Sequence, residues 1–399
     1  MTASPRVSPL RLLHVVPTYL PAVRYGGPIR SVHALCRALA AQGHQADVFT
    51  TNVDGPGNSD VPLGRPVDIE GVKVTYFPSK MLRRLYWSPA MRRALLDRVG
   101  GYDLVHVHAI YLWPTAMAAR VARRRGVPYV VSPRGMLVPE LIRRKSRRVK
   151  EAWIKLIERS NLEHAAAIHT TSAIEAHHLA SFGWSLHHVS TIPHGVDDPP
   201  SPTGQALSPD ISAAIAGAPP ILAFGRISWE KGLDRLVEAL PRVPDARLVI
   251  AGNDGGHAAA LAEKARLFHV DGRVTIIARQ VGGADKEALF GSAALFAMTS
   301  LSENFGLAAF EAMRRSLPVL TVPDVGMSEI VREAGAGAVV APSPEGIAGG
   351  LGALLADKAA SHAMGVRGRE RVLAEYGWDA IATRMSALYQ SAIEENARA

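Results

Sequence analysis

The chain has 399 residues, 48% hydrophobic and 20% charged, a length that favours two globular domains over a single core. Its one cysteine, Cys36, excludes an internal disulfide framework, and no run approaches the roughly 18 apolar residues of a membrane-spanning helix. The net charge of +9 favours anionic partners, namely phosphorylated ligands, a membrane surface or nucleic acid. Residues 1–21 lack the apolar core of a signal peptide, so we expect a cytoplasmic protein.

From the N-terminus, strand-like runs alternate with helical patterns, which is typical of a parallel α/β sheet. The run "RLLHVV" predicts a first strand, and the helix after the next loop has Pro28 in its first turn and Gly43 at its end. Further buried strands are predicted at "ADVFTT", "YDLVHVHA", "PYVVSP" and "AAAIHTTS". Residues 192–220 are rich in Pro, Gly, Ser and Ala, and we place a domain boundary there, after residue 200.

The same alternation restarts beyond this stretch. Strands are predicted at "ILAFGR", "ARLVIAG", "RVTIIAR", "AALFAMTS", "LPVLTVP" and "GAVVAP". We therefore predict an α/β protein with two doubly wound Rossmann-like domains, 1–200 and 201–377, facing across a cleft. Residues 378–399 form an amphipathic helix that we expect to pack back on the first domain, with one apolar face made of Ile381, Met385, Leu388 and Tyr389. Ligands of such sheets bind beyond the carboxyl ends of the strands.

The segment "FGRISWEKGL" carries two cations at one of these strand ends. Arg226 and Lys231 lie in the loop between a strand that ends at Gly225 and a helix that begins near Gly232. Two cations beside a helix N-terminus can bind a phosphate or a diphosphate. The alternative is a surface turn whose Arg and Lys are simply solvated.

The segment "TSLSENFGLAAFEAM" surrounds a helix start with two carboxylates. If the helix begins near Gly306, its free amides face the same site as the two cations, and Glu311 lies roughly 7.5 Å along the axis. A diphosphate at the helix start would then bring a ribose near Glu311 and a sugar near Glu303. Taken alone, the spacing fits equally well a Glu303 that complements the helix dipole and a Glu311 that faces solvent.

Taken together, these motifs resemble the signature of the family 4 retaining glycosyltransferases, which have the GT-B fold. The resemblance rests on "GRISWEKG" and "ENFGLAAFE", and it extends over nearly the whole chain through "GGPIRSVHALCRALAAQGHQADVFT", "DLVHVHA" and "IPHGVD". The segment "SPRGML" resembles members that assemble bacterial exopolysaccharide or lipopolysaccharide.

The resemblance assigns roles to the residues of the second domain. It implies that Arg226 and Lys231 hold the diphosphate of a nucleotide-sugar donor. Glu303 would bind hydroxyls of the transferred sugar, and Glu311 would bind the nucleotide ribose. The sugar and the phosphates would also be bound by the backbone amides of Phe305, Gly306 and Leu307. Where many relatives have proline this chain has Asn304, so either the loop differs or Asn304 contacts the sugar.

In the first domain, the resemblance implies that Gly27 approaches the phosphates closely, which a side chain would block. His108 would lie beside the sugar, whereas His106, two residues deeper in the same strand, is better explained as a structural histidine. Arg134 either lines the cleft or forms a structural salt bridge.

The implied reaction is retaining transfer of a hexosyl-type sugar to a glycan or lipid-linked acceptor, in the synthesis of a cell-envelope polysaccharide. Fixed cations and helix amides would stabilise the diphosphate leaving group. Because no Asp-x-Asp motif occupies a plausible loop, we expect neither a metal nor a cofactor.

Residues 142–157 predict a basic amphipathic helix. Six Lys or Arg residues lie between Arg143 and Lys150, and Ile142, Val149, Trp153 and Leu156 form the expected apolar stripe. We expect this helix to contact the anionic inner face of the plasma membrane, the alternative being a helix packed on the domain with a solvated charged face. Nucleic acid is not an expected partner, because no recognition motif or aromatic platform accompanies the charges.

Other functions fit the residues less well. A nicotinamide dehydrogenase would need G-x-G-x-x-G after a strand, which neither "RYGGPIRS" nor "AGNDGGHA" supplies. A glycoside hydrolase would not need a cationic diphosphate site. A sugar-nucleotide epimerase on the same fold and a non-catalytic membrane-surface binding protein remain as alternatives.

Overall fold

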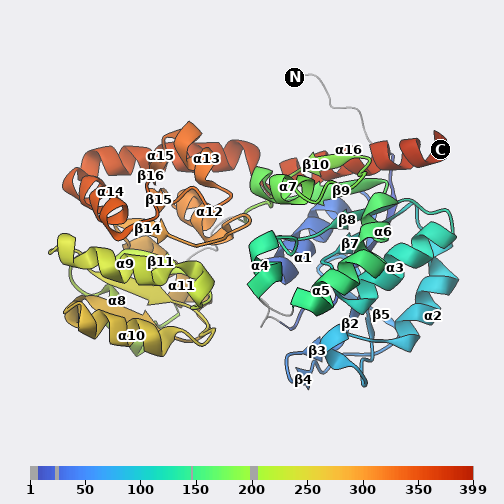
Figure 1. Ribbon diagram of the computed structural model, residues 1–399, viewed down its shortest axis with the longest axis horizontal. Helices are drawn as coiled ribbons and strands as arrows, with labels where there is room; N and C mark the ends of the chain where they lie inside the picture. The colour runs from blue at the N-terminus through green and yellow to red at the C-terminus, as the bar shows by residue number, and fades with distance from the viewer. Residues whose placement is uncertain (1–7, 23–26, 145–146, 198–204, 399) are drawn as a thin grey trace. The chain divides into compact units, whose positions relative to one another are not determined.

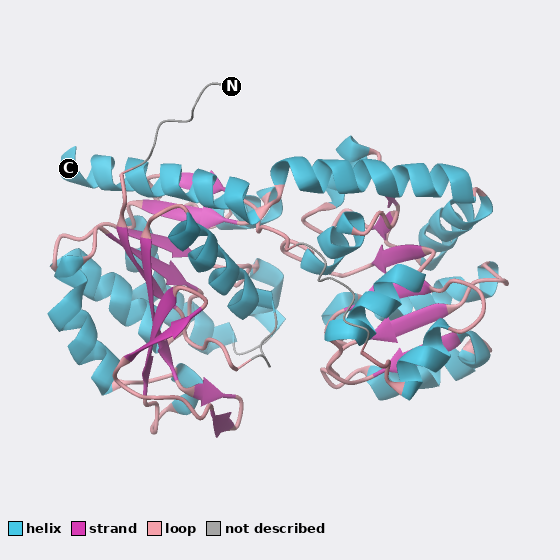
Figure 2. Ribbon diagram, turned by 180° about the vertical axis from the view of Figure 1, so that it is seen from behind, coloured by secondary structure: helices cyan, strands magenta, loops and turns pink. Residues whose placement is uncertain are grey.

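The computed structural model describes residues 8–22, 27–144, 147–197 and 205–398, which belong to two compact units. Unit 1 comprises Met1–Gly195 and Trp378–Ala399, and unit 2 comprises Val196–Gly377. Within each unit, helices cover both faces of a sheet (Figure 1, Figure 2). The predicted α/β class is therefore confirmed for both units.

The sheet of unit 1 has eight strands in the order β10-β9-β8-β7-β1-β2-β6-β5. All neighbouring strands are parallel except β5 and β6, which pair antiparallel and were not predicted from the sequence. A separate small hairpin joins β3 (Val53–Asp54) to β4 (Gly57–Asn58). The eight strands are β1 (Arg11–Val15), β2 (Gln45–Thr51), β5 (Pro66–Ile69), β6 (Val72–Phe77), β7 (Leu104–His108), β8 (Tyr129–Ser132), β9 (Ala167–Thr170) and β10 (Val189–Thr191).

The main helices of unit 1 bury apolar residues against the two faces of this sheet. Helices α2 (Pro89–Arg98) and α3 (Trp113–Arg124) share one core with strands β1, β2 and β7. On the other face, α1 (Gly27–Ala41) packs with α16 (Trp378–Arg398), and α7 (Ala173–Ala180) lies between β9 and β10 in the chain. The C-terminal helix thus belongs to unit 1, with its predicted apolar residues Ile381, Met385, Leu388 and Tyr389 buried.

The apolar stripe predicted for a helix over residues 142–157 is wrong. The described residues there are helical, in α4 (Pro139–Arg144), α5 (Arg147–Trp153), a π-helical turn (Ile154–Glu158) and α6 (Arg159–Glu163), while Lys145 lies outside the described residues. Because the π-helical turn interrupts the 3.6-residue period, Leu156 does not keep the predicted register with Val149 and Trp153. Ile142 is buried, Trp153 is half-buried, and Val149 and Leu156 are 69% and 76% exposed.

The sheet of unit 2 has six parallel strands in the order β13-β12-β11-β14-β15-β16, all at the predicted places. The strand order reverses between β11 and β14, which is the point at which open α/β sheets bind ligands. The strands are β11 (Ile221–Phe224), β12 (Leu248–Ala251), β13 (Val274–Ile277), β14 (Leu295–Met298), β15 (Val319–Thr321) and β16 (Gly337–Val339).

Helices cover this second sheet from both sides. One core lies under α9 (Leu233–Ala239), α10 (Ala258–Leu267) and α14 (Pro344–Ala356). The opposite core is covered by α8 (Pro209–Ile215), α11 (Gly283–Ser292), α12 (Leu307–Arg314), α13 (Ser328–Ala334) and α15 (Lys358–Glu375).

Candidate functional site

Two cations follow β11 at the strand-order reversal of unit 2. Arg226 is exposed, and it forms no hydrogen bond or ion pair with any residue that the structure describes. Lys231 ends a short 3-10 turn that begins at Trp229, and Gly232 follows it with φ 58°. Both cations line a hollow together with residues from the ends of β11 and β14, including Phe224, Gly225, Met298, Thr299 and Ser300.

Glycine at position 232 brings the loops after β11 and β14 together. A Cβ atom on Gly232 would lie 2.2 Å from the carbonyl oxygen of Thr299. The Thr299 hydroxyl in turn donates to the Gly232 carbonyl over 3.0 Å. Only glycine permits this approach with a positive φ, so the position of Lys231 beside the end of β14 depends on it.

Glu303 forms an ion pair with Lys231. The backbone of Glu303 is held by two hydrogen bonds, to the Asp324 carbonyl over 3.2 Å and from the Gly326 amide over 2.8 Å. The side chains of Lys231 and Glu303 are 26% and 19% exposed, so the pair remains accessible to a ligand.

Helix α12 begins at Leu307, one residue from the predicted start, with Gly306 as its N-cap at φ 91°. The amides of Gly306 and Leu307 donate to no acceptor within the described parts of the chain. Unpaired amides at a helix N-terminus carry partial positive charge and bind anions. Phe305 is buried and stacks on Phe310 with ring centroids 4.5 Å apart, and Asn304 is half-buried in the same loop.

Lys286 is a candidate site residue that no motif in the sequence indicated. It lies on α11, and its Nζ atom is 2.7 Å from Oε1 of Glu311. The same ammonium lies 5.4 Å from the ring centroid of Phe224, the last residue of β11. No motif surrounds Lys286 in the sequence, and only the packing of α11 against α12 and β11 reveals its contact with Glu311.

Gly27 and His108, the other predicted site residues, belong to unit 1. Gly27 is the first residue of α1, and His108 is the last residue of β7 and only 1% exposed. Strand β7 neighbours β1, and the strand order of this sheet also reverses between these two.

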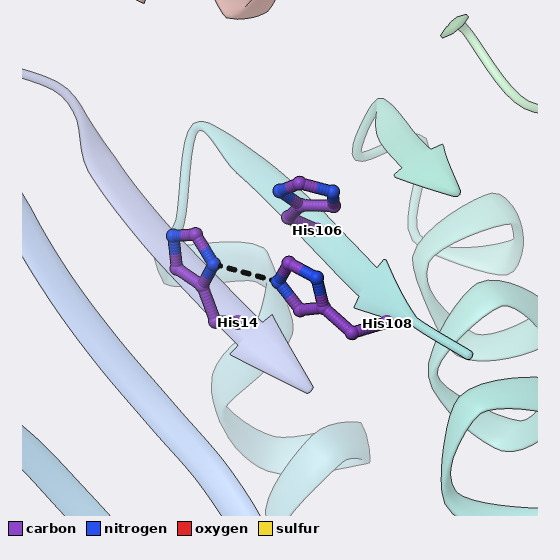
Figure 3. Close-up of side chains that lie close together, drawn as sticks. All are labelled: His14, His106 and His108. Atoms are coloured by element: carbon purple, nitrogen blue, oxygen red, sulfur yellow. Dashed lines mark hydrogen bonds between the residues drawn. The ribbon is translucent and has the colours of Figure 1, made fainter. Parts of the chain in front are cut away.

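Hydrogen bonds determine which nitrogen of His108 carries the proton. Nη2 of Arg134 donates to Nδ1 of His108 over 2.9 Å, and a guanidinium can only donate. The proton of His108 therefore sits on Nε2, which donates to Nδ1 of His14 over 3.0 Å (Figure 3). Both ring nitrogens of His108 are thus engaged within unit 1.

His106 also has both ring nitrogens engaged. Nδ1 lies 2.7 Å from the hydroxyl of Tyr389 and Nε2 lies 2.7 Å from Oγ of Ser132. Nitrogens of His14, His106 and His108 lie within 4.8 Å of one another (Figure 3), close enough for a metal site. A metal would need a free nitrogen lone pair from each of the three rings. In His106 and His108 both ring nitrogens are already engaged in hydrogen bonds. The arrangement is better described as a buried hydrogen-bond network.

The histidines of this network are neutral at pH 7. Burial, with a further contribution from the charge of Arg134, lowers the pKa of His14 and of His169 to about 3. Burial also lowers the pKa of His106 and His108 well below the ordinary value, and the neighbouring histidines add to the effect. His169 shares Ser132 with His106 as a hydrogen-bond partner.

Comparison with known proteins identifies relatives along the whole chain. Residues 26–195 match the family model "Glycosyl transferase 4-like domain", and residues 209–371 match "Glycosyl transferases group 1". A D-inositol 3-phosphate glycosyltransferase of Jonesia denitrificans is 30% identical, over 92% of this chain and 91% of the relative. The GDP-mannose:cellobiosyl-diphosphopolyprenol alpha-mannosyltransferase of Komagataeibacter xylinus is 27% identical, over 96% of this chain and 94% of the relative. The crystal structure of Anabaena HepE in complex with UDP and glucose has the same fold, with a TM-score of 0.72. Its sequence is 18% identical, and the match covers 96% of this chain and 100% of HepE.

The buried histidines predict that acid destabilises unit 1. In the unfolded chain a histidine has a pKa of about 6.5, so below that pH the unfolded state binds protons that the folded state does not. Stability is therefore retained above pH 6.5 and falls below it, by up to about 1.4 kcal/mol per pH unit for each buried histidine. Thermal unfolding between pH 7.5 and 5.5, followed by calorimetry, measures this slope.

The variant His169→Gln should flatten the slope, since an amide can still bond with Ser132 and with the Ile192 carbonyl that His169 contacts. The exposed His177→Gln is the matched control and should leave the slope unchanged. An unfolding midpoint of wild-type protein that does not move over this pH range would contradict the assignment of neutral buried histidines.

Proposed function

The chain belongs to the family 4 glycosyltransferases of GT-B fold, and from this membership we propose that it transfers a sugar from a nucleotide-diphosphate donor, with retention, to a glycan or lipid-linked acceptor. We further propose that the product is a cell-envelope polysaccharide. The observation that carries the proposal is the hollow at the strand-order reversal of unit 2, which Arg226 and Lys231 line and where Lys231 pairs with Glu303.

A nucleotide sugar is the donor that fits these groups. Its diphosphate needs several fixed positive groups. A guanidinium and an ammonium line the hollow of unit 2, and the N-terminus of α12 follows shortly after Glu303, which pairs with that ammonium. The solved structure of HepE contains UDP and glucose, and the name of the Komagataeibacter relative specifies GDP-mannose, which supports the same class of donor here.

In the proposed mechanism the positive groups stabilise the leaving diphosphate. Negative charge develops on the diphosphate as the bond to the sugar breaks, and preorganised donors lower the barrier because they need no reorganisation. Arg226 has no hydrogen bond or ion pair among the described residues and can turn to the phosphates, whereas Lys231 would bind both the phosphates and Glu303. We propose that these groups take the place of a divalent ion.

The two carboxylates would bind hydroxyl groups on either side of the diphosphate, Glu303 on the transferred sugar and Glu311 on the ribose. Each carboxylate has a lysine partner, Lys231 and Lys286, which offsets its repulsion of the donor phosphates. His108 would bind a sugar hydroxyl through its ring only by exchanging its bond with Arg134 or His14. The contacts of Gly27, Asn304 and the Phe305 amide remain predictions.

The acceptor is proposed to be lipid-linked and to be reached at a membrane surface. Among the described residues, no helix is both long and apolar enough to cross a bilayer. Around the π-helical turn of unit 1, however, two exposed apolar side chains lie among exposed basic ones: Arg148, Val149, Lys155 and Leu156. Such a surface can contact anionic lipid, each basic residue contributing on the order of 1 kcal/mol.

The phosphate assignment predicts that Lys231→Ala loses at least a hundredfold in turnover while remaining folded, because one fixed donor to a developing anion typically contributes about 2.7–4 kcal/mol. Turnover should be measured with a panel of nucleotide sugars, with and without acceptor. Lys264→Ala is the matched control, since Lys264 pairs with Glu238 and Asp234 and does not line the hollow. Near-normal activity of Lys231→Ala would contradict the assignment, and isomerised donor formed without acceptor would indicate an epimerase.

The contact between Lys286 and Glu311 predicts a binding defect in Lys286→Met. Without the ammonium, the Glu311 carboxylate loses its fixed partner and faces the donor phosphates uncompensated. We expect the Kd for the nucleoside diphosphate of the preferred donor to rise about tenfold, equivalent to about 1.4 kcal/mol. Calorimetric titration measures it, with Lys264→Met as the control. Unchanged affinity in Lys286→Met would remove Lys286 from the donor site.

The membrane surface predicts that Leu156→Glu weakens sedimentation with liposomes of anionic lipid at low salt, because it places a charge where an apolar side chain would enter the interface. Leu267→Glu is the matched control, since Leu267 is 72% exposed on unit 2. Wild-type protein that fails to sediment with these liposomes, or a Leu156→Glu variant that binds as well as wild type, would exclude this surface.

A further inference from the structure

Arg134 is a cation that forms no ion pair with any residue that the structure describes. It follows β8 after Pro133, at the carboxyl edge of the unit 1 sheet, and its side chain is half-buried. Within the described residues it forms no salt bridge, so the structural ion pair considered from the sequence is not present. The carboxylate of Glu175 acts on it from a distance but accepts hydrogen bonds from the amides of Gly135 and Thr171 instead.

The groups that Arg134 does contact are all neutral. Its guanidinium reaches the hydroxyl of Ser31 over 3.2 Å, Nδ1 of His108 over 2.9 Å and the ring of His194 over 3.1 Å. Burial lowers the pKa of Arg134 to about 10 and that of His194 well below its ordinary value, so at neutral pH the arginine is charged and the imidazole is not. The side chains that touch the guanidinium therefore add no charge of their own, and Nε of Arg134 is buried without a hydrogen-bond partner among the described residues.

The backbone holds Arg134 in an unfavourable conformation. Arg134 and Gly135 have φ values of 60° and 70°, and a non-glycine residue rarely adopts the first of these. The bond from the Gly135 amide to the buried carboxylate of Glu175 ties this turn to α7. A strained residue that holds a charge without an ion pair costs free energy of folding, and such strain is concentrated at ligand sites.

We propose that Arg134 anchors an oxyanion site in unit 1 that binds a phosphate group of the acceptor, an inference that rests on the proposed transferase function. The planar guanidinium offers donors in the geometry that phosphate oxygens accept, and the neutral rings beside it add no repulsion or competing charge. A lipid-linked saccharide acceptor carries such a phosphate. Arg134 would also keep the proton of His108 on Nε2, so acceptor binding and the hydrogen bonds of His108 would be coupled.

The test is a titration of inorganic phosphate into the full-length protein, followed by calorimetry. Lys231→Ala serves as the background, because it weakens the proposed donor site of unit 2 and leaves unit 1 intact. We expect phosphate to bind this background, and the additional change Arg134→Gln to weaken that binding at least tenfold. Arg134→Lys, which keeps the charge without the planar fork, should retain part of the affinity. Arg120→Gln is the matched control, since Arg120 is exposed on α3 and has no hydrogen bond or ion pair among the described residues.

A second measurement does not depend on any variant folding. In wild-type protein labelled with ¹⁵N-histidine, phosphate should shift the ring signals of His108 and His194, and glucose should not. Phosphate binding that Arg134→Gln leaves unchanged, ring signals that phosphate does not move, or binding of acetate in place of phosphate would each overturn the proposal. Because neither measurement uses a nucleotide sugar, failure of the donor assignment would leave this result standing, and failure here would leave the donor assignment standing.

Discussion

The reversal of strand order between β11 and β14 is the constraint on which the site of unit 2 depends. At that point the loops that follow the two strands leave the sheet in opposite directions and open a hollow between them. Gly232 then lets the first loop approach the backbone of Thr299, which brings Lys231 beside Glu303. The two cations and the first carboxylate therefore come together because of topology and one glycine contact.

Charge compensation separates the groups of this site into two kinds. Glu303 and Glu311 each have a lysine partner, so neither carboxylate is a bare negative charge beside a diphosphate. Arg226 has no hydrogen bond or ion pair among the described residues, so its donors are available to a ligand. Arg134 is its counterpart in unit 1, where the side chains that the guanidinium touches are neutral. In both units a guanidinium without an ion pair to the described residues follows the carboxyl end of a parallel strand.

The buried histidines of unit 1 explain how an arginine can lie beside imidazoles in the protein interior. Burial keeps the rings neutral, and each nitrogen of His106 and His108 has a hydrogen-bond partner, which offsets the cost of removing polar groups from water. The network reaches from β1 and β7 to Tyr389 on α16. The C-terminal helix thus completes the interior of unit 1, and the chain must return there before the network can form.

The sequence by itself determined the α/β class, the strands of the unit 2 sheet, the start of α12 and the membership in the family, because short apolar runs and strand-end motifs are local features. It did not determine the π-helical turn at Ile154–Glu158, since a 3.6-residue period read across such a turn assigns residues to the wrong face. The lysine partners of the two carboxylates, the proton position on His108 and the neutral hydrogen-bond partners of Arg134 were decided only by the tertiary structure. Each of these features depends on side-chain atoms from different elements coming within about 3 Å of one another. The spacing of residues along the chain does not specify such contacts.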